Sequence, residues 1–164
     1  MGTRQTLKMM RREVLRDRFL PRLRLLVLDL VRPLPPKAFG AEINAVFQFV
    51  RTRIRYTLDH NGRELLQSPH VTLNLGTGDC DDMCILLACL LESLGHACYF
   101  CAVGFEQPGF FSHVYVLCDP AGDARKLSSC IALDATENYP MGWEPGGITC
   151  KMVCAIDADM NVQA

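Results

Sequence analysis

The feature of this sequence that most constrains its fold is an apolar run over residues 83–94 that follows a segment rich in Gly and Asp. Asp79 is a favourable N-cap residue, Asp82 stands three positions later as in a capping box, and Gly95 suits the position just after a helix end. Together they predict a helix over residues 80–94. Because its apolar side chains cover more than one face, we expect this helix at the centre of the core.

The segments on either side of this helix differ in their hydrophobic period. Before it, residues 40–52 carry apolar side chains at helical spacing, which predicts an amphipathic helix that buries Ile43, Val46, Phe47 and Val50. After it, β-rich runs with a period near two predict strands over residues 97–103, 111–118, 126–136 and 148–156. Helices followed by adjacent strands indicate an α+β fold with an antiparallel sheet.

The composition is that of a compact folded chain. Its 164 residues are 49% hydrophobic and 21% charged, which is close to the average of globular domains. No apolar stretch approaches the roughly 18 residues that a membrane span requires, so we expect no such span. Pro21 and Arg22 interrupt the apolar core that a signal peptide needs. This favours a reducing, cytoplasmic compartment.

Nine cysteines are a high and odd number for this length. A chain this long can bury a core without disulfides, so most of the thiols are expected to act as small hydrophobic side chains. Cys98 and Cys101 have CxxC spacing, but in a strand their side chains point to opposite faces, which disfavours a redox motif. The remaining spacings lack the paired pattern of zinc sites, and no metal is required.

Charge divides the chain into a basic N-terminal segment and an acidic remainder. Residues 1–37 hold ten Lys and Arg against three acidic residues, whereas residues 38–164 hold seven against fifteen. With the Pro-rich stretch 33–36 as a linker, this predicts a basic N-terminal arm over residues 1–37 and a folded domain over residues 38–164.

The basic arm has two interpretations. Its pattern is partly helical and is interrupted by Pro21. Its arginines suit a contact surface for an acidic protein partner or for nucleic acid, although neither zinc-finger spacing nor an aromatic-rich strand adds support for nucleic acid. The other interpretation is a solvated helix that packs one apolar stripe on its own domain.

Three residues have the chemistry of a thiol enzyme. Cys80 falls in the first turn of the predicted central helix, where backbone N–H groups and the helix dipole stabilise a thiolate, although the neighbouring aspartates raise the thiol pKa unless a cation offsets them. His113 begins a strand in which it shares a face with Tyr115 and Leu117, so we expect it to reach a helix packed on that face. Asp134 is a carboxylate in an otherwise apolar strand, suited to orient an imidazole.

These residues lie in three blocks that resemble the transglutaminase-like superfamily of cysteine peptidases and acyltransferases. In chain order the blocks are Gly78-Asp79-Cys80-Asp81-Asp82 with the Leu-rich helix and Leu94-Gly95-His96, then His113-Val114-Tyr115-Val116, then Leu133-Asp134-Ala135-Thr136. The resemblance covers about residues 43–145 and is most similar to the small forms of bacteria and tailed phages.

The resemblance implies a papain-like core, in which the nucleophile helix packs on an antiparallel sheet. It implies Cys80 as nucleophile, His113 as general base and later acid, and Asp134 as the orienting carboxylate. Such an enzyme cleaves or transfers the acyl groups of peptide or protein substrates through a thioester. The oxyanion is expected to bind the Cys80 N–H and a second donor, for which Gln67 is the candidate.

Two further expectations accompany the resemblance. Some bacterial relatives bind calcium through acids beside the nucleophile, which makes Asp81 and Asp82 candidate calcium ligands, although no cofactor is required. The alternative function is a structural or assembly protein of a phage tail or neck that retains the domain and docks on a virion partner through the basic arm. In that case the protein would be located in the virion.

Overall fold

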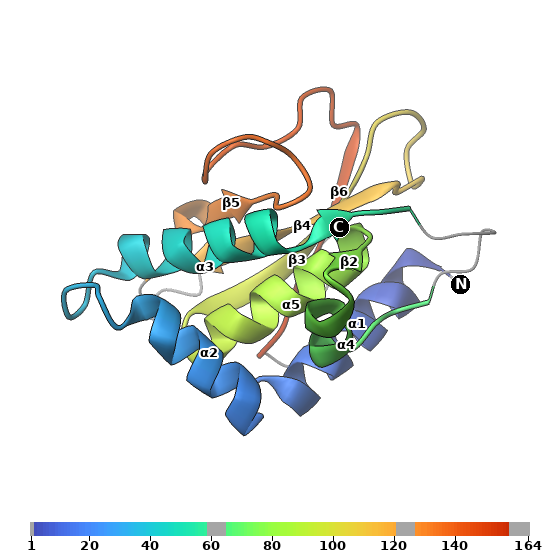
Figure 1. Cartoon of the computed structure of the whole chain (residues 1–164). Coiled ribbons are helices and arrows are strands. Elements are labelled where there is room, and N and C mark those ends of the chain that lie inside the picture. The colour runs from blue at the N-terminus through green and yellow to red at the C-terminus, as the bar shows by residue number, and fades with distance from the viewer. Residues whose placement is uncertain (1, 59–64, 121–126, 158–164) are drawn as a thin grey trace.

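The computed structural model describes residues 2–58, 65–120 and 127–157. Its helices are α1 (Thr3–Asp17), α2 (Pro21–Val31), α3 (Phe39–Arg53), α4 (Pro69–Leu75) and α5 (Cys80–Ser93). Its strands are β1 (Arg55–Tyr56), β2 (Thr77–Gly78), β3 (Ala97–Gly104), β4 (His113–Asp119), β5 (Ile131–Leu133) and β6 (Cys150–Ala155), with a short 3₁₀ turn at Leu127–Ser129. Figure 1 shows the helices gathered on one side of the main sheet.

Two sheets of different size organise the backbone. The main sheet is antiparallel with strand order β5-β4-β3-β6, and β3 pairs with β4 so that Val103 lies opposite His113. β1 and β2 form a separate parallel ladder in which Tyr56 lies opposite Gly78. This ladder ends two residues before Cys80 and therefore fixes the backbone that leads into α5. The predicted α+β fold with an antiparallel sheet is confirmed.

Helix α5 occupies the centre of the core, as its apolar faces predict. Its capping box is complete: the Asp82 N–H donates to the Asp79 carboxylate at 3.0 Å, and the Asp79 N–H donates to the Asp82 carboxylate at 3.3 Å. Twelve of its fourteen residues are buried, and it packs against the four other helices and the sheet. Gly95 ends it with a φ of 94°, a left-handed conformation that favours glycine.

The two faces of the main sheet pack differently. Val114, Val116 and Cys118 of β4 belong to the large core that contains α5. Tyr115 belongs to a small cluster on the opposite face, against which Leu117 packs. The prediction that the central helix packs on the face of Tyr115 and Leu117 is therefore wrong. The two β-branched valines make the other face the better partner for an apolar helix.

All nine cysteines are free thiols, and six of them are buried. Their burial agrees with the prediction that most act as small hydrophobic side chains. Cys98 lies in the large core and Cys101 in the small cluster, so their side chains point to opposite faces as the alternation of a strand requires.

Helices α1 and α2 share the core of the remaining chain. Pro21 is the first residue of α2 and separates the two helices. The apolar stripes that they bury in the cluster around α5 are Leu7, Met10 and Val14 on α1 and Leu23 and Val27 on α2. Of the two interpretations of residues 1–37, the structure agrees with helices that pack on the domain. One hydrophobic core therefore contains residues from both the predicted arm and the predicted domain.

The other predicted elements agree with the structure to different degrees. The predicted helix over 40–52 corresponds to α3. The predicted strand over 126–136 is shorter, since β5 covers only three residues after the 3₁₀ turn, and Lys126 lies outside the described residues. Within the described ranges, no helix is long and apolar enough to cross a bilayer.

Candidate active site

Cys80 is the first residue of α5 and lines a pocket of about 500 Å³. His113 and Val114, at the start of β4, line the same pocket. The connection between β3 and β4 supplies a second wall, formed by Gly109, Phe110, Phe111 and Ser112. The first turns of α1 supply a third wall, formed by Gly2, Thr3, Thr6, Leu7 and Met10.

His113 and Asp134 form a hydrogen-bonded pair at this pocket. The Nε2–H of His113 donates to Asp134 Oδ2 at 2.7 Å. Asp134 follows β5, is 3% exposed, and its other oxygen accepts from the backbone N–H and the hydroxyl of Thr136 at 3.1 and 2.7 Å. With Nε2 carrying the proton toward the carboxylate, Nδ1 is the ring nitrogen that can accept a proton.

The Asp134 carboxylate is held in its charged form. Burial by itself raises its pKa, but the hydrogen bond and charge of His113, together with the two hydrogen bonds from Thr136, bring the pKa below its ordinary value. The carboxylate is therefore ionised at neutral pH.

The surroundings of Cys80 raise the pKa of its thiol. Burial is the main cause, followed by the negative charges of Asp81 and Asp79, while a hydrogen bond with the Val114 backbone opposes them. The thiol donates to Asp81 Oδ1 at 3.7 Å. Of the two opposing effects expected for this thiol, burial and the charges of the two aspartates outweigh the helix N-terminus. The sulfur needs a base to lose its proton.

The structure does not bring Gln67 to this pocket. The Gln67 backbone N–H donates to Asp82 Oδ1 at 2.7 Å, and its side-chain oxygen accepts from the Thr72 hydroxyl at 3.4 Å. These contacts tie the segment before α4 to the first turn of α5. Gln67 thus supports the helix that carries the cysteine.

The two candidate calcium ligands have different surroundings. Asp82 is fully buried, and its oxygens accept from the backbones of Gln67 and Asp79. It does not fit the role of a calcium ligand, because such a cation needs several oxygens directed at one centre. Asp81 accepts the Cys80 thiol, and its binding of calcium stays a prediction. Among the described residues, no three His, Cys, Asp or Glu side chains are grouped to hold a metal ion.

Tyr56 is a neighbour of the site that the sequence did not indicate. It is 41% exposed and lies opposite Gly78 in the β1–β2 ladder. Burial raises the pKa of its hydroxyl, and the charges of Cys80, Asp79 and Asp134 raise it further. The β1–β2 ladder therefore places Tyr56 beside the segment that leads into Cys80. Only the pairing of β1 with β2 brings it there, so no local pattern in the sequence could have found it.

Solved structures share this architecture. A candidate protease from Parabacteroides distasonis matches 95% of this chain and 30% of its own, with a TM-score of 0.66 and 11% identity. A candidate cysteine protease from Cytophaga hutchinsonii matches 86% of this chain and 53% of its own, with a TM-score of 0.53 and 16% identity. LapG of Legionella pneumophila matches 85% of this chain and 76% of its own, with a TM-score of 0.54 and 17% identity.

The chain has the fold of these proteins. This agrees with the predicted core, a central helix with the cysteine at its start packed on an antiparallel sheet. The chain spans only 30% and 53% of the first two structures. No protein-family model matches the sequence, and no curated protein matches it either. None of the three structures is described as a phage or virion protein.

Proposed function

We propose that this chain is a thiol-dependent hydrolase or acyltransferase of the transglutaminase-like superfamily that acts on peptide or amide bonds. The observation that carries the proposal is that Cys80 and His113 line one pocket while Asp134 is bonded to Nε2 of the imidazole. The fold shared with a candidate cysteine protease supports it. In this proposal Cys80 is the nucleophile, His113 the base and acid, and Asp134 the orienting carboxylate.

The proposed first step joins proton transfer to nucleophilic attack. Nδ1 of His113 takes the thiol proton as the Cys80 sulfur attacks the carbonyl carbon of the substrate. Because the pKa of the thiol is raised, the proton leaves during the attack instead of before it. Asp134 stabilises the imidazolium that forms. His113 then protonates the departing amine, and the acyl group stays on sulfur as a thioester.

The proposed oxyanion donors come from the start of α5 and from β1. The Cys80 N–H belongs to the first turn of a helix, so it has no partner within the helix and can bind the developing negative charge. We propose the Tyr56 hydroxyl as the second donor, because Tyr56 lies opposite Gly78, two residues before Cys80, in the ladder that leads into α5.

The thioester can be resolved in two ways. Attack by water regenerates the thiol and gives hydrolysis, whereas attack by a second amine gives acyl transfer. In both cases His113 removes a proton from the incoming nucleophile. Supplying the protein with a glutamine-containing peptide, with and without an added primary amine, separates the two outcomes by the mass of the product.

Alkylation with iodoacetamide followed by peptide mass mapping tests the proposed site. The partly exposed Cys130 and Cys150 are internal references on the same molecule. We expect the modification of Cys80 relative to Cys150 to fall at least about tenfold in His113→Ala, because the base is lost. An unchanged ratio in that variant would contradict an activated thiol.

Substrate cleavage provides the second test. A peptide library is incubated with the wild-type chain, with Cys80→Ala and with Cys150→Ala as the matched control. We expect products, cleaved or deamidated, from the wild type and Cys150→Ala but not from Cys80→Ala. The same products from all three proteins would show that the chemistry does not come from Cys80.

A further inference from the structure

The outward surface of α1 and α2 suggests a role separate from the thiol chemistry. We propose that this surface docks on an anionic lipid bilayer, with a basic groove on α1 against the headgroups and the corner between α1 and α2 inserted among them. The docking is peripheral and needs no membrane-spanning segment. It does not rest on the proposed function.

The outer side of α1 is an open groove with a basic lining. Its volume is about 480 Å³, and its lining residues are Lys8, Arg11, Arg12, Leu15 and Arg16. Arg16 is paired with Glu13 at 2.5 Å and with Asp17 at 2.7 Å, whereas the other lining residues include no acidic side chain. Clusters of cations on an amphipathic helix are typical of surfaces that bind anionic lipids.

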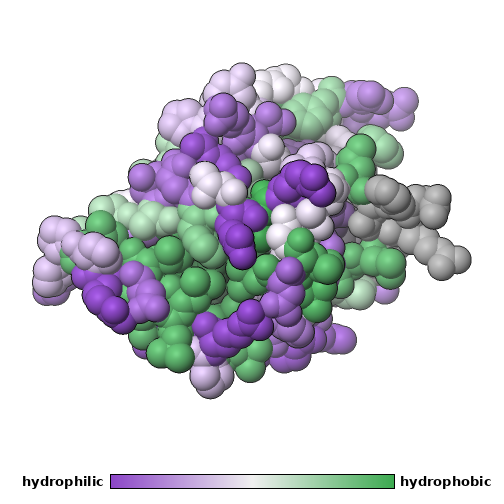
Figure 2. Space-filling view, viewed as in Figure 1, coloured by the Kyte–Doolittle hydropathy of each residue, from purple (hydrophilic) through white to green (hydrophobic). Residues whose placement is uncertain are grey.

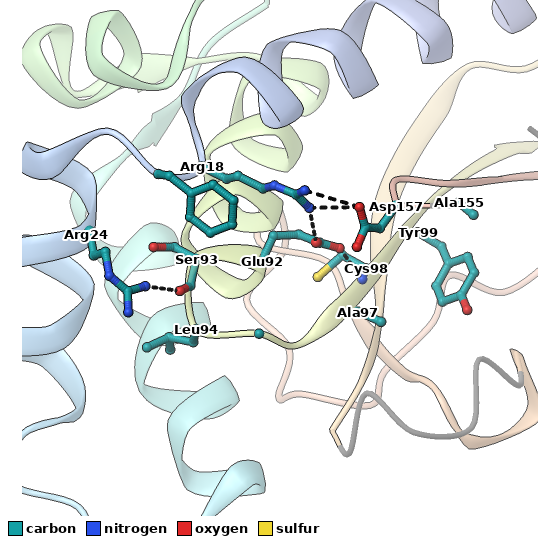
Figure 3. A pocket seen from close by; sticks show the side chains of 12 residues that line it. Arg18, Arg24, Glu92, Ser93, Leu94, Ala97, Cys98, Tyr99, Ala155 and Asp157 are labelled. Atoms are coloured by element: carbon teal, nitrogen blue, oxygen red, sulfur yellow. Dashed lines mark hydrogen bonds and ion pairs between the residues drawn. The ribbon is translucent and has the colours of Figure 1, made fainter. Parts of the chain in front are cut away.

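Two other arginines of the N-terminal helices have structural partners. Arg18 donates to Glu92 at 3.0 Å and to Asp157 at 3.2 Å, and Arg24 donates to the Ser93 carbonyl at 2.5 Å, as Figure 3 shows. These bonds fasten α1 and α2 to the end of α5. The guanidinium groups of Arg18 and Arg24 therefore stabilise the fold through these bonds.

The groove holds cations without such partners. No hydrogen bond or ion pair joins Lys8 or Arg12 to another residue in the part of the chain that the structure describes. Both side chains are exposed. Their charge is therefore available to an external anion.

The corner between α1 and α2 exposes apolar side chains. Phe19 is 61% exposed and Leu20 is 39% exposed, and the Arg18 guanidinium lies 4.9 Å from the centre of the Phe19 ring. Figure 1 shows the two helices meeting at the bottom of the molecule. Phe and Leu beside cations at a protruding corner suit the boundary between lipid headgroups and acyl chains.

The groove and Phe19 lie on the same side of α1, toward the edge strand β6. Lys8, Arg12 and Arg16 are four residues apart, so they share one face of α1, and α1 contacts β6. Phe19 lines a pocket with Asp157, just beyond the end of β6. A single flat surface can therefore contact the groove and the corner together.

Apolar exposure continues along α2. Leu25 is 65% exposed and Leu28 is 40% exposed. Figure 2 shows hydrophobic surface over the part of the molecule where α2 lies. A helix with apolar side chains on its outer face as well as on its buried face is typically covered by another molecule on its outer face.

A bilayer accounts for the charge and for the apolar side chains together. Nucleic acid would neutralise the cations but would leave Phe19, Leu20 and Leu25 in water. An anionic bilayer offers negative headgroups with hydrocarbon beneath them. Each Lys or Arg near such a surface strengthens binding by about fivefold.

Vesicle flotation of the full chain tests the proposal. We expect binding to vesicles of phosphatidylcholine with phosphatidylserine and none to phosphatidylcholine alone. Salt should release the protein, because the screening length falls from about 8 Å at 0.15 M to about 3 Å at 1 M. The double variant Lys8→Glu with Arg12→Glu should lose at least about tenfold in affinity, and Phe19→Ser with Leu20→Ser should also weaken binding.

The matched control is Arg53→Glu with Arg55→Glu, which makes the same change in net charge at exposed positions outside the surface. It should bind like the wild type. Circular dichroism and Tm show that each variant is folded. The proposal is overturned if the control loses binding as strongly as Lys8→Glu with Arg12→Glu. It is also overturned if the protein binds duplex DNA but not phosphatidylserine vesicles.

Discussion

Asp134 holds the imidazole of His113 through Nε2 at 2.7 Å, and Thr136 holds Asp134 in turn. His113 begins β4 and Asp134 directly follows β5, and these strands are neighbours in one sheet, so the sheet sets the distance between the two residues. A carboxylate that accepts from Nε2 leaves the lone pair of the neutral ring on Nδ1. The pair thereby selects the tautomer that can act as a base.

Replacing Asp134 by Ala should slow the alkylation of Cys80 by at least about tenfold, because the imidazole loses its orientation and the charge that stabilises its protonated form. The reaction is followed by mass mapping at fixed pH. Asp29→Ala is the control, since Asp29 is exposed and pairs only locally with Arg32. Equal rates in the wild type and Asp134→Ala would mean that the pair does not serve the cysteine.

The raised pKa of Cys80 predicts how alkylation depends on pH. Because burial, Asp81 and Asp79 all keep the thiol protonated, the rate should rise steadily between pH 7 and about 9 without a plateau. Asp81→Asn removes one of these charges and should raise the rate several-fold at pH 8. A plateau below pH 7 in the wild type would show instead that the thiolate is already formed in the free protein.

Asp79→Ala should change stability and reactivity in opposite directions. Loss of the N-cap should lower the free energy of unfolding by about 1 kcal/mol. Removal of the negative charge should lower the pKa of Cys80 and accelerate its alkylation. Urea unfolding and alkylation of the same samples measure both effects. If the free energy of unfolding and the alkylation rate both decrease, the Asp79 cap matters more for positioning the thiol than for raising its pKa.

The low pKa of Asp134 makes a small part of the stability depend on pH. A carboxylate whose pKa is lower in the folded state contributes stability that is complete above its unfolded value, about 3.9, and is lost as the pH falls through the folded value. Thr136→Val removes the hydroxyl bond of 2.7 Å and should cost about 1 kcal/mol at pH 7. Urea unfolding at pH 7 and below pH 4 should show the difference shrinking in acid.

Gly104→Ala should disturb the wall of the cysteine pocket. A Cβ at Gly104 would overlap the Phe110 carbonyl and lie 2.8 Å from the Cys150 sulfur, so the β3–β4 connection would have to move. We expect a loss of about 2 kcal/mol in the free energy of unfolding. Gly40→Ala is the matched control, because a Cβ there meets nothing within 4 Å. Equal stability of the two variants would contradict the close approach.

The parts of the fold that could be predicted have local signals. Asp79 and Asp82 mark the start of α5 and Gly95 marks its end, so the local pattern alone predicts the helix and its cap. His113 and Asp134 interrupt apolar strands, and a polar group in such a place needs a partner. The structure makes them partners, as the resemblance implies.

The parts that could not be predicted depend on contacts distant in the sequence. Tyr56 comes to the segment before Cys80 only through the pairing of β1 with β2, and the first turns of α1 reach the cysteine pocket only through the packing of α1 on α5. The pKa of Cys80 depends on opposing effects. The helix N-terminus lowers it, whereas burial and the neighbouring aspartates raise it. Its direction follows only when the burial of the sulfur is known.

Gly2 and four residues of α1 line the cysteine pocket, so the N-terminal segment is part of the proposed active site. Under the proposed function, the residues after α2 should not be active without α1. Removal of α1 and α2 would take away one side of the cavity and expose the apolar side chains of α5 that these helices cover. Deletions from the N-terminus should therefore abolish the proposed activity well before they reach Cys80, His113 or Asp134.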